Sequence, residues 1–255
     1  MLVKVATVAA LLSASLYAQA PAKTAPAATA AAELPSAREL VDRHVKAIGG
    51  RDAILAHKSM HATGTLTVSA SGITAPVDLY GAAPDRVLLR SSIPGIGEVV
   101  DAYDGTHAWS INPMTGPTLK TGKEFEQTKL DADFYSELRD PKKYTLKTVE
   151  KTAFDGRDCY KVSVKRTDGS EDFDFYDVAT GLRAGSINTR ETPMGPLTVS
   201  NIEGGYKKFG SLTQATTLKQ TMMGIEQTIA LTSVEYDNVD LSVFDPPAVI
   251  KALIK

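Results

Sequence analysis

The sequence predicts a mainly β (α+β) protein in which about 11–12 antiparallel strands form a barrel or half-barrel with helices across its mouth. From His61 onward, apolar and polar residues alternate in short segments spaced roughly ten residues apart. Turn-forming pairs such as Asp104-Gly105 and Asp168-Gly169 separate these segments. Few helical segments accompany them. A single sheet of this size curls because twist accumulates, so it must bury one face largely on itself.

Residues 1–20 have the pattern of a cleaved signal peptide. Lys4 precedes an apolar stretch over residues 5–16, and Ala18-Gln19-Ala20 supplies a small-x-small cleavage site. The stretch is shorter than the ~20 residues that cross a bilayer, and a short N-terminal anchor is the alternative. Residues 21–34, rich in Ala and Pro, predict a flexible linker, and residues 35–255 the folded domain. We therefore expect an exported protein.

Order begins with a helix. Ser36 and Glu39 are spaced as a capping box, and apolar residues then recur at helical spacing as far as Ile48. Gly49-Gly50 predicts the left-handed end of this helix, and a short second helix is expected over residues 52–56. A third helix with a loop is predicted within the segment 124–140, which lacks Gly and Pro. We expect the helices over 36–48 and 125–138 to form a lid.

The predicted strands follow the period-two pattern. They cover residues 62–70, 73–80, 85–93, 97–103, 107–112, 144–152, 158–166, 171–178, 182–189, 197–207, 212–222 and 225–236. A two-residue turn at Asp168-Gly169 would pair Arg166 with Glu171 and Val164 with Phe173. This register places Asp172 on an outward, solvated face together with Asp174.

Composition excludes several classes. The 255 residues carry 28 Lys+Arg and 30 Asp+Glu, a net charge of -2, which argues against nucleic-acid binding. A hydrophobic content of 43% is that of a globular protein rather than a disordered chain. Cys159 is the single cysteine, so no intramolecular disulfide forms, and a free thiol is expected.

Motifs for catalysis or metal binding are missing from the sequence. It contains no G-x-S-x-G, H-E-x-x-H, P-loop or dinucleotide-binding glycine pattern. His57 and His61 are separated by residues that begin a strand, and strand spacing puts them about 13 Å apart, too far for one metal. His44 lies on the apolar stripe of the first helix as a core residue. We predict no catalytic residue, metal site or cofactor, although an enzyme assembled from distant residues stays open.

Several motifs resemble a known family. They are Pro84-Asp85-Arg86-Val87, Ser92-Ile93-Pro94-Gly95, the stretch from Tyr103 through Trp109 to Pro113, and the closing Phe244-Asp245-Pro246-Pro247. In this order they resemble the periplasmic lipoprotein carriers, the LolA/LolB-like family of outer-membrane lipoprotein-sorting proteins, across roughly residues 40–249. Carriers of the best-known type keep an arginine on an early strand that bonds the lid. The corresponding residues 62–80 contain none.

The resemblance implies a half-open antiparallel β-barrel with a helical lid and an apolar cavity for acyl chains. The expected ligand-cavity residues are Trp109, Ile111, Val87, Leu89, Val162, Val164, Phe173 and Phe175. The implied function is a carrier or receptor for a lipid or lipoprotein in outer-membrane biogenesis. We also predict a monomer that binds no nucleic acid. The alternative is an envelope sensor or protein-interaction domain on the same scaffold, with envelope membrane proteins as partners.

Overall fold

The computed structural model describes residues 33–192 and 195–254. The predicted signal peptide and all but the last two residues of the predicted linker lie outside the described residues. The helical elements within them are α1 (Ala37–Ala47), α2 (Arg51–Ala56), α3 (Gly122–Asp131), the 3-10 turns η1 (Ser136–Leu138) and η2 (Leu241–Phe244), and α4 (Ala248–Lys251). Among the described residues, no helix has the length and apolar character needed to cross a membrane.

Thirteen of the described strands form one antiparallel sheet, in the order β6-β5-β4-β3-β2-β1-β15-β14-β11-β10-β9-β8-β7. The strands are β1 (Ser59–Val68), β2 (Ile73–Ala82), β3 (Arg86–Ile93), β4 (Gly97–Tyr103), β5 (Ala108–Asn112), β6 (Gly116–Leu119), β7 (Tyr144–Phe154), β8 (Arg157–Arg166), β9 (Glu171–Asp177), β10 (Arg183–Arg190), β11 (Leu197–Gly204), β14 (Thr217–Met222) and β15 (Ile225–Tyr236). A separate hairpin pairs β12 (Lys207–Phe209) with β13 (Leu212–Gln214).

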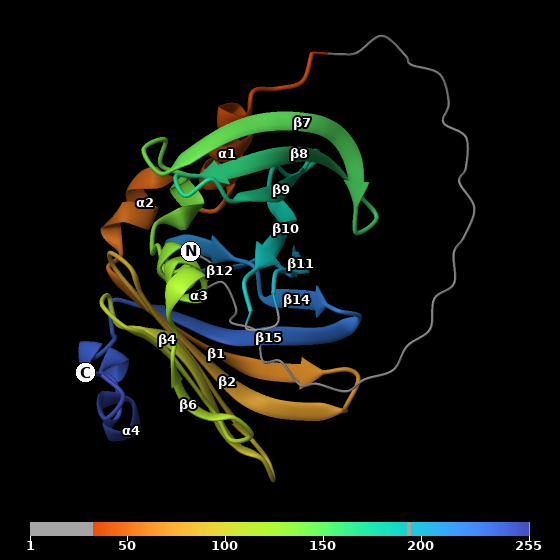
Figure 1. Ribbon diagram of the computed structural model, residues 1–255. Helices are drawn as coiled ribbons and strands as arrows, with labels where there is room; N and C mark the ends of the chain where they lie inside the picture. The colour runs from red at the N-terminus through yellow and green to blue at the C-terminus, as the bar shows by residue number, and fades with distance from the viewer. Residues whose placement is uncertain (1–32, 193–194, 255) are drawn as a thin grey trace.

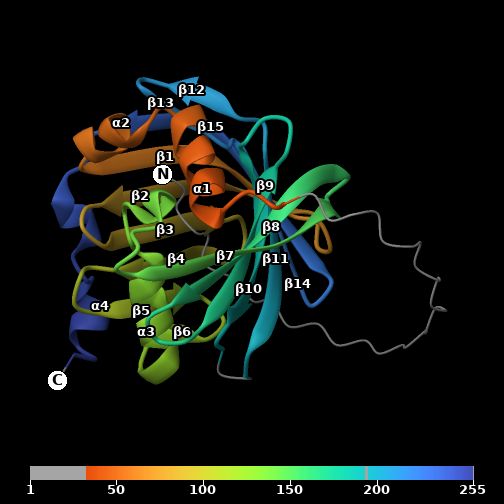
Figure 2. The same cartoon turned by 90° about the horizontal axis from the view of Figure 1, so that it is seen from above.

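The sheet is not closed, because β6 and β7 at its two ends do not pair with each other. It curls strongly, and α1, α2 and α3 lie on its open side (Figure 1). The view from above shows the same arrangement (Figure 2). The predicted fold class, a half-open antiparallel barrel with helices as a lid, is confirmed. The strand count differs from the prediction partly because the short β6 was missed, and because the strand predicted over 197–207 ends at Gly204 and is followed by the separate β12. In addition, residues 212–222 break into β13 and β14 at Ala215-Thr216, so the single strand predicted there is wrong.

Helix α1 begins at the predicted capping box. The amide of Glu39 donates to Ser36 Oγ at 3.3 Å, and the amide of Ser36 donates to Glu39 Oε2 at 2.8 Å. The chain turns away after Ile48 at Gly49, whose φ of 127° an L side chain rarely adopts. The apolar stripe of α1 is buried against β7, β9 and η1. The helix therefore covers one end of the sheet.

The predicted register of the β8–β9 hairpin is wrong by one residue. The turn contains three residues rather than two, because the amide of Arg166 donates to the carbonyl of Ser170 and Gly169 takes the left-handed position at φ 87°. Val164 consequently pairs with Asp172, and Val162 with Asp174. A shift of one residue moves alternate side chains to the other face. The two aspartates are thus buried, and the prediction that they lie on a solvated face is wrong.

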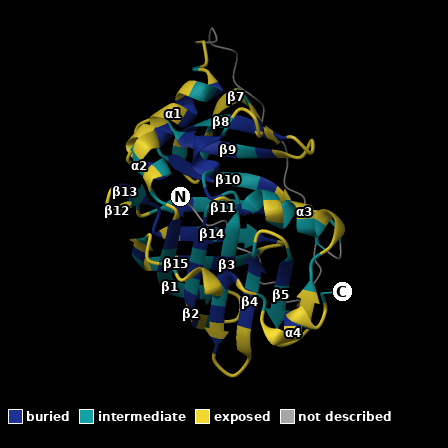
Figure 3. Ribbon diagram, turned by 90° about the vertical axis from the view of Figure 1, so that its left-hand side faces the viewer, coloured by how far each residue is buried: buried dark blue, intermediate teal, exposed yellow. Residues whose placement is uncertain are grey.

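Both faces of the sheet bury apolar side chains. The lid-facing side carries the clusters beneath α1 and beneath the segment that follows α3. The outer side of β3–β5 is covered by the C-terminal segment through Phe244 and Ile250. Cys159 is free and buried in a fourth cluster with Phe175 on the outer side of β8–β9. Figure 3 shows buried residues along the strands, whereas α3 carries only intermediate and exposed ones.

Candidate functional site

Helix α3 bridges the two halves of the curled sheet. On one side Phe125 meets Tyr103 of β4 edge-on, with ring centroids 6.0 Å apart. On the other side Gln127 Nε2 donates to the carbonyl of Thr189 at 2.6 Å, and the amide of Glu191 donates to Gln127 Oε1 at 2.7 Å. No residue of α3 is fully buried. Helix α3 therefore rests on the sheet with few buried apolar contacts of its own.

Residues 122–139, which we call the lid segment, are tied to the sheet by ion pairs. These pairs, which we call the lid latch, join Asp131 with Arg166 and Arg190, Glu137 with Arg183, and Arg139 with Asp174. The Glu137–Arg183 contact measures 2.7 Å, and the Arg139–Asp174 contact 2.6 Å. The arginines from the sheet come from β8 and β10. The ion pairs of the lid latch are therefore made with β8, β9 and β10.

Glu137 lies at the centre of the lid latch and is 3% exposed. It also contacts His44 Nε2 at 3.0 Å, while His44 Nδ1 accepts from the amide of Arg183 at 3.1 Å. An N–H group can only donate, so Nδ1 carries no proton and the neutral ring donates from Nε2 to Glu137. Burial alone would raise the pKa of Glu137, but Arg183 and His44 outweigh it and hold that pKa well below its usual range. Glu137 is therefore ionised at neutral pH.

An apolar floor lies on the lid-facing side of the sheet. We use this name for Leu66, Val77, Leu79, Leu89, Leu218 and Ile229, which pack together in one buried cluster. Phe134, which follows α3, packs on the same cluster and is 2% exposed. The apolar surface beneath the lid is thus covered by a side chain of the lid segment itself.

A pocket adjoins this floor. It is lined by Arg139, Asp174, Arg183, Ser186, Asn188, Arg190, Asn201, Ile202, Glu203, Leu218, Lys219, Gln220, Gln227 and Ile229. Water-sized molecules can occupy about 40 Å³ of it. That is room for a few waters, whereas ligand pockets usually measure ~300–1,000 Å³. Leu218 and Ile229 belong both to the pocket and to the apolar floor, so the two are continuous.

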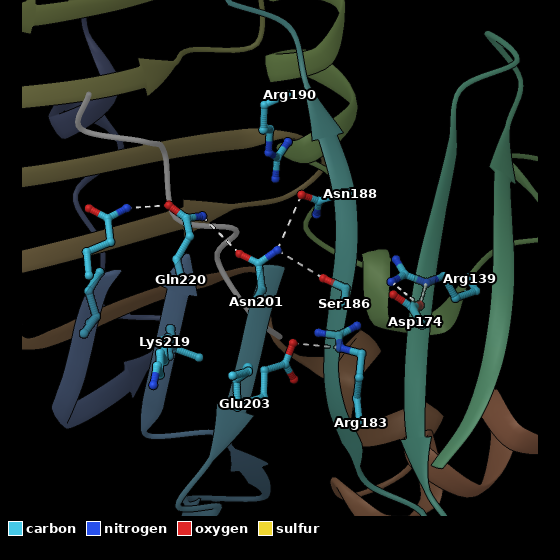
Figure 4. A pocket seen from close by; sticks show the side chains of 14 residues that line it. Arg139, Asp174, Arg183, Ser186, Asn188, Arg190, Asn201, Glu203, Lys219 and Gln220 are labelled. Atoms are coloured by element: carbon cyan, nitrogen blue, oxygen red, sulfur yellow. Dashed lines mark hydrogen bonds and ion pairs between the residues drawn. The ribbon is translucent and has the colours of Figure 1, made fainter. Parts of the chain in front are cut away.

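Side-chain amides form a ladder across the pocket, as Figure 4 shows. Gln227 donates to Gln220, Gln220 donates to Asn201 Oδ1 at 3.0 Å, and Asn201 donates to Asn188 Oδ1 at 3.4 Å and to Ser186 Oγ at 3.3 Å. Directly opposite residues share a face of a sheet, and Asp174, Ser186, Asn201, Gln220 and Gln227 form one such row over five strands. The row faces the lid, because Arg139 of the lid latch bonds Asp174.

The predicted cavity residues are divided between the two faces. Val87 lies beneath the lid beside Tyr103, and Leu89 lies there in the cluster with Phe134. Val162 and Val164 lie beneath α1. Trp109 and Ile111 lie on the outer side against the C-terminal segment, and Phe173 and Phe175 lie on the outer side beside Cys159. The residues that line the pocket described above include none of the eight. Their part in ligand binding stays a prediction.

The two histidines considered as metal ligands bond to other partners. His57 Nδ1 contacts Asp237 Oδ2 at 2.7 Å and Nε2 contacts Ser211 Oγ at 2.8 Å. His61 contacts Asp78 at 2.7 Å. The Ser211–His57–Asp237 contacts join the α2–β1 junction, the β12–β13 turn and the end of β15, and we interpret them as a structural tie. Within the described ranges, no group of three or more His, Cys, Asp and Glu side chains is arranged to hold a metal ion.

Sequence reasoning missed the amide ladder and the lid latch. The ladder residues lie at alternate positions in their strands, as inward residues must, but their neighbourhood depends on the order in which the strands pair. The acidic and basic residues of the latch are separated by 35 to 59 residues along the chain. The sequence did contain one signal for these residues, namely polar side chains at strand positions where the alternation predicts an inward side chain.

No protein-family model and no curated protein matches the sequence. A solved structure of a DUF1329 family protein from Desulfovibrio piger is similar at a TM-score of 0.56 and 14% identity, over 84% of this chain and 98% of that one. A LolA superfamily protein from Nitrosomonas europaea is similar at a TM-score of 0.56 and 10% identity, over 84% and 99%. A domain from Vibrio parahaemolyticus described as an outer membrane lipoprotein-sorting protein is similar at a TM-score of 0.54 and 13% identity, over 82% and 96%. The chain therefore shares its fold with a LolA superfamily protein and with this lipoprotein-sorting domain, so the fold that the resemblance in its motifs implies is confirmed.

Proposed function

We propose that the protein is a periplasmic carrier or receptor that binds an acylated or otherwise apolar ligand, a lipid or a lipoprotein, beneath its lid. The observation that carries the proposal is the apolar floor covered by Phe134, a residue of a segment that polar contacts hold in place. Similarity in fold to a LolA superfamily protein and to an outer membrane lipoprotein-sorting domain supports it. Binding of this kind makes and breaks no covalent bond.

Affinity would come from removing methylene groups from water, which contributes about 0.8 kcal/mol each. The pocket with the lid in place has room for a few waters, so an acyl chain enters only if the lid segment moves and Phe134 leaves the floor. Phe134 then acts as a substitute for ligand in the closed state. The ligand must offset the loss of its packing, and it does so with the first few buried methylenes.

The test is a binding experiment on the chain from Pro21 onward, purified from a periplasm without detergent. Native mass spectrometry should detect a co-purified lipid, and a dansyl-labelled fatty-acid methyl ester, which has no free carboxylate, should gain fluorescence on titration. Phe134→Ala should bind the probe more tightly, because the floor is no longer covered. Phe154→Ala is the matched control. Phe154 stacks on Phe175 on the outer face at 4.0 Å, so its loss should lower stability and leave probe binding unchanged.

Absence of co-purified lipid together with no probe binding by either the wild type or Phe134→Ala would contradict the proposal. A protein that co-purifies in place of lipid would favour the interaction-domain alternative. Equal effects of Phe134→Ala and Phe154→Ala on probe binding would show that the acyl chain of the probe does not lie on the floor beneath Phe134.

A further inference from the structure

We propose that the amide ladder of Asn188, Asn201, Gln220 and Gln227 binds the uncharged ester or amide carbonyl groups from which the ligand's acyl chains extend. The inference rests on the proposed function and adds to it the chemical class of the ligand's polar part. Figure 4 shows the ladder side by side with the paired ions of the same pocket.

The first support is the hydrogen-bonding capacity of the ladder. A side-chain amide carries two N–H donors. Among the described residues, Gln220 and Gln227 each donate one hydrogen bond, both within the ladder. Their exposed fractions are 4% and 7%, and both residues line the pocket. A buried donor is most stable when it is paired, so the second N–H groups favour a ligand that brings acceptors.

The second support is the contrast within one row of the sheet. Val162 lies next to Asp174 at one end of the row, and Val68 lies next to Gln227 at the other. Apolar residues therefore fit this face on both sides of the ladder. Buried amides cost more to desolvate than valine or leucine would, and a hydrocarbon chain gains nothing from them. Their presence indicates a ligand with polar groups at this level of the sheet.

The third support is the distance between the ladder and the apolar floor. Leu218 and Gln220 are two residues apart on β14, and Gln227 and Ile229 are two apart on β15. Such neighbours on one face are separated by ~7 Å. A chain lying on the floor therefore brings the carbonyl at its head to the ladder within a few bonds. Acylglycerols and acylated peptides both have this order of groups.

The charges in the pocket favour a neutral head. Arg139 is paired with Asp174, Arg183 with Glu203 and Glu137, and Arg190 with Asp131, all within hydrogen-bond reach. Each guanidinium already has a carboxylate partner. A free fatty-acid carboxylate or a phosphate would have to compete with these partners, whereas an ester or amide carbonyl needs only N–H donors.

The experiment compares ester-linked with ether-linked lipids of the same chain length, which differ only in their carbonyl groups. We expect the wild type to bind a dipalmitoyl glycerol on the order of tenfold more tightly than its dihexadecyl ether, as one or two hydrogen bonds provide. Gln220→Met removes an N–H group offered to the ligand, and Asn201→Leu removes the oxygen that positions Gln220, so each should reduce this ratio to near one. Gln214→Met is the control. Gln214 is a buried amide outside the ladder, and its loss should keep the ratio. A palmitoylated peptide competing against dipalmitoyl glycerol distinguishes the two sources of the carbonyl.

Each outcome decides the inference. Equal binding of ester and ether by the wild type overturns it while the proposed function stands. Binding of neither lipid overturns the proposed function itself. A preference that persists in folded Asn201→Leu and Gln220→Met places the recognition elsewhere. If either variant fails to fold, as circular dichroism would show, Gln227→Met at the end of the ladder replaces it in the same comparison.

Discussion

Replacing Arg183 by methionine should destabilise the domain strongly. Arg183 is 5% exposed and contacts Glu137 at 2.7 Å and Glu203 at 2.8 Å, both of which are 3% exposed. Without the guanidinium, the buried carboxylates of Glu137 and Glu203 lose the cation with which both are paired. Breaking a buried ion pair on one side costs about 3–5 kcal/mol. For a domain of this size we expect the melting temperature to fall by about 6–20 °C.

The loss should depend on pH. In the variant the loss of the guanidinium lets the pKa of Glu137 rise, and protonation of that carboxylate relieves the buried charge, so the deficit should shrink as the pH falls from 7.5 toward 5. Urea unfolding followed by circular dichroism measures it. Lys151→Met removes the exposed pair with Asp158 and should cost at most about 1 kcal/mol at either pH. A deficit below 1 kcal/mol for Arg183→Met, or one that is the same at both pH values, would refute the reasoning.

Three further predictions concern stability. Ile250→Ala should cost about 2–5 kcal/mol and shift the emission of Trp109 to longer wavelength, because the two pack in one buried cluster; unchanged emission would contradict the packing. Burial by itself would raise the pKa values of Glu137 and Asp237. The guanidinium of Arg183 nevertheless lowers the pKa of Glu137, and hydrogen bonds from backbone amides and from His57 lower the pKa of Asp237. Stability should therefore hold above pH 4.5 and fall as the pH drops through the folded pKa values, which an acid titration followed by circular dichroism checks. Gly169→Ala should cost about 1–2 kcal/mol because φ is 87°, and a cost near zero in urea unfolding would contradict the left-handed conformation of Gly169.

Local signals predicted most of the elements. The capping box and the Gly49-Gly50 end placed α1 because these interactions lie within a few residues of one another. The strands β4 and β15 have the predicted bounds, since alternation within a strand is also local. The β8–β9 register was wrong for a local reason as well. Asp168-Gly169 fits both a two-residue and a three-residue turn, and the side-chain pairs of the shorter turn looked equally favourable.

The sequence by itself determined the fold class, because period-two patterning and the number of strands force a curled antiparallel sheet with helices on its open side. Only the tertiary structure decided which residues face the lid. Trp109 lies on the outer side because the C-terminal segment covers that side, and no pattern near residue 109 contains this information. The lid latch and the amide ladder likewise join residues from strands that are distant in the chain. Their neighbourhoods follow from strand order and register, where a shift of one residue exchanges the two faces.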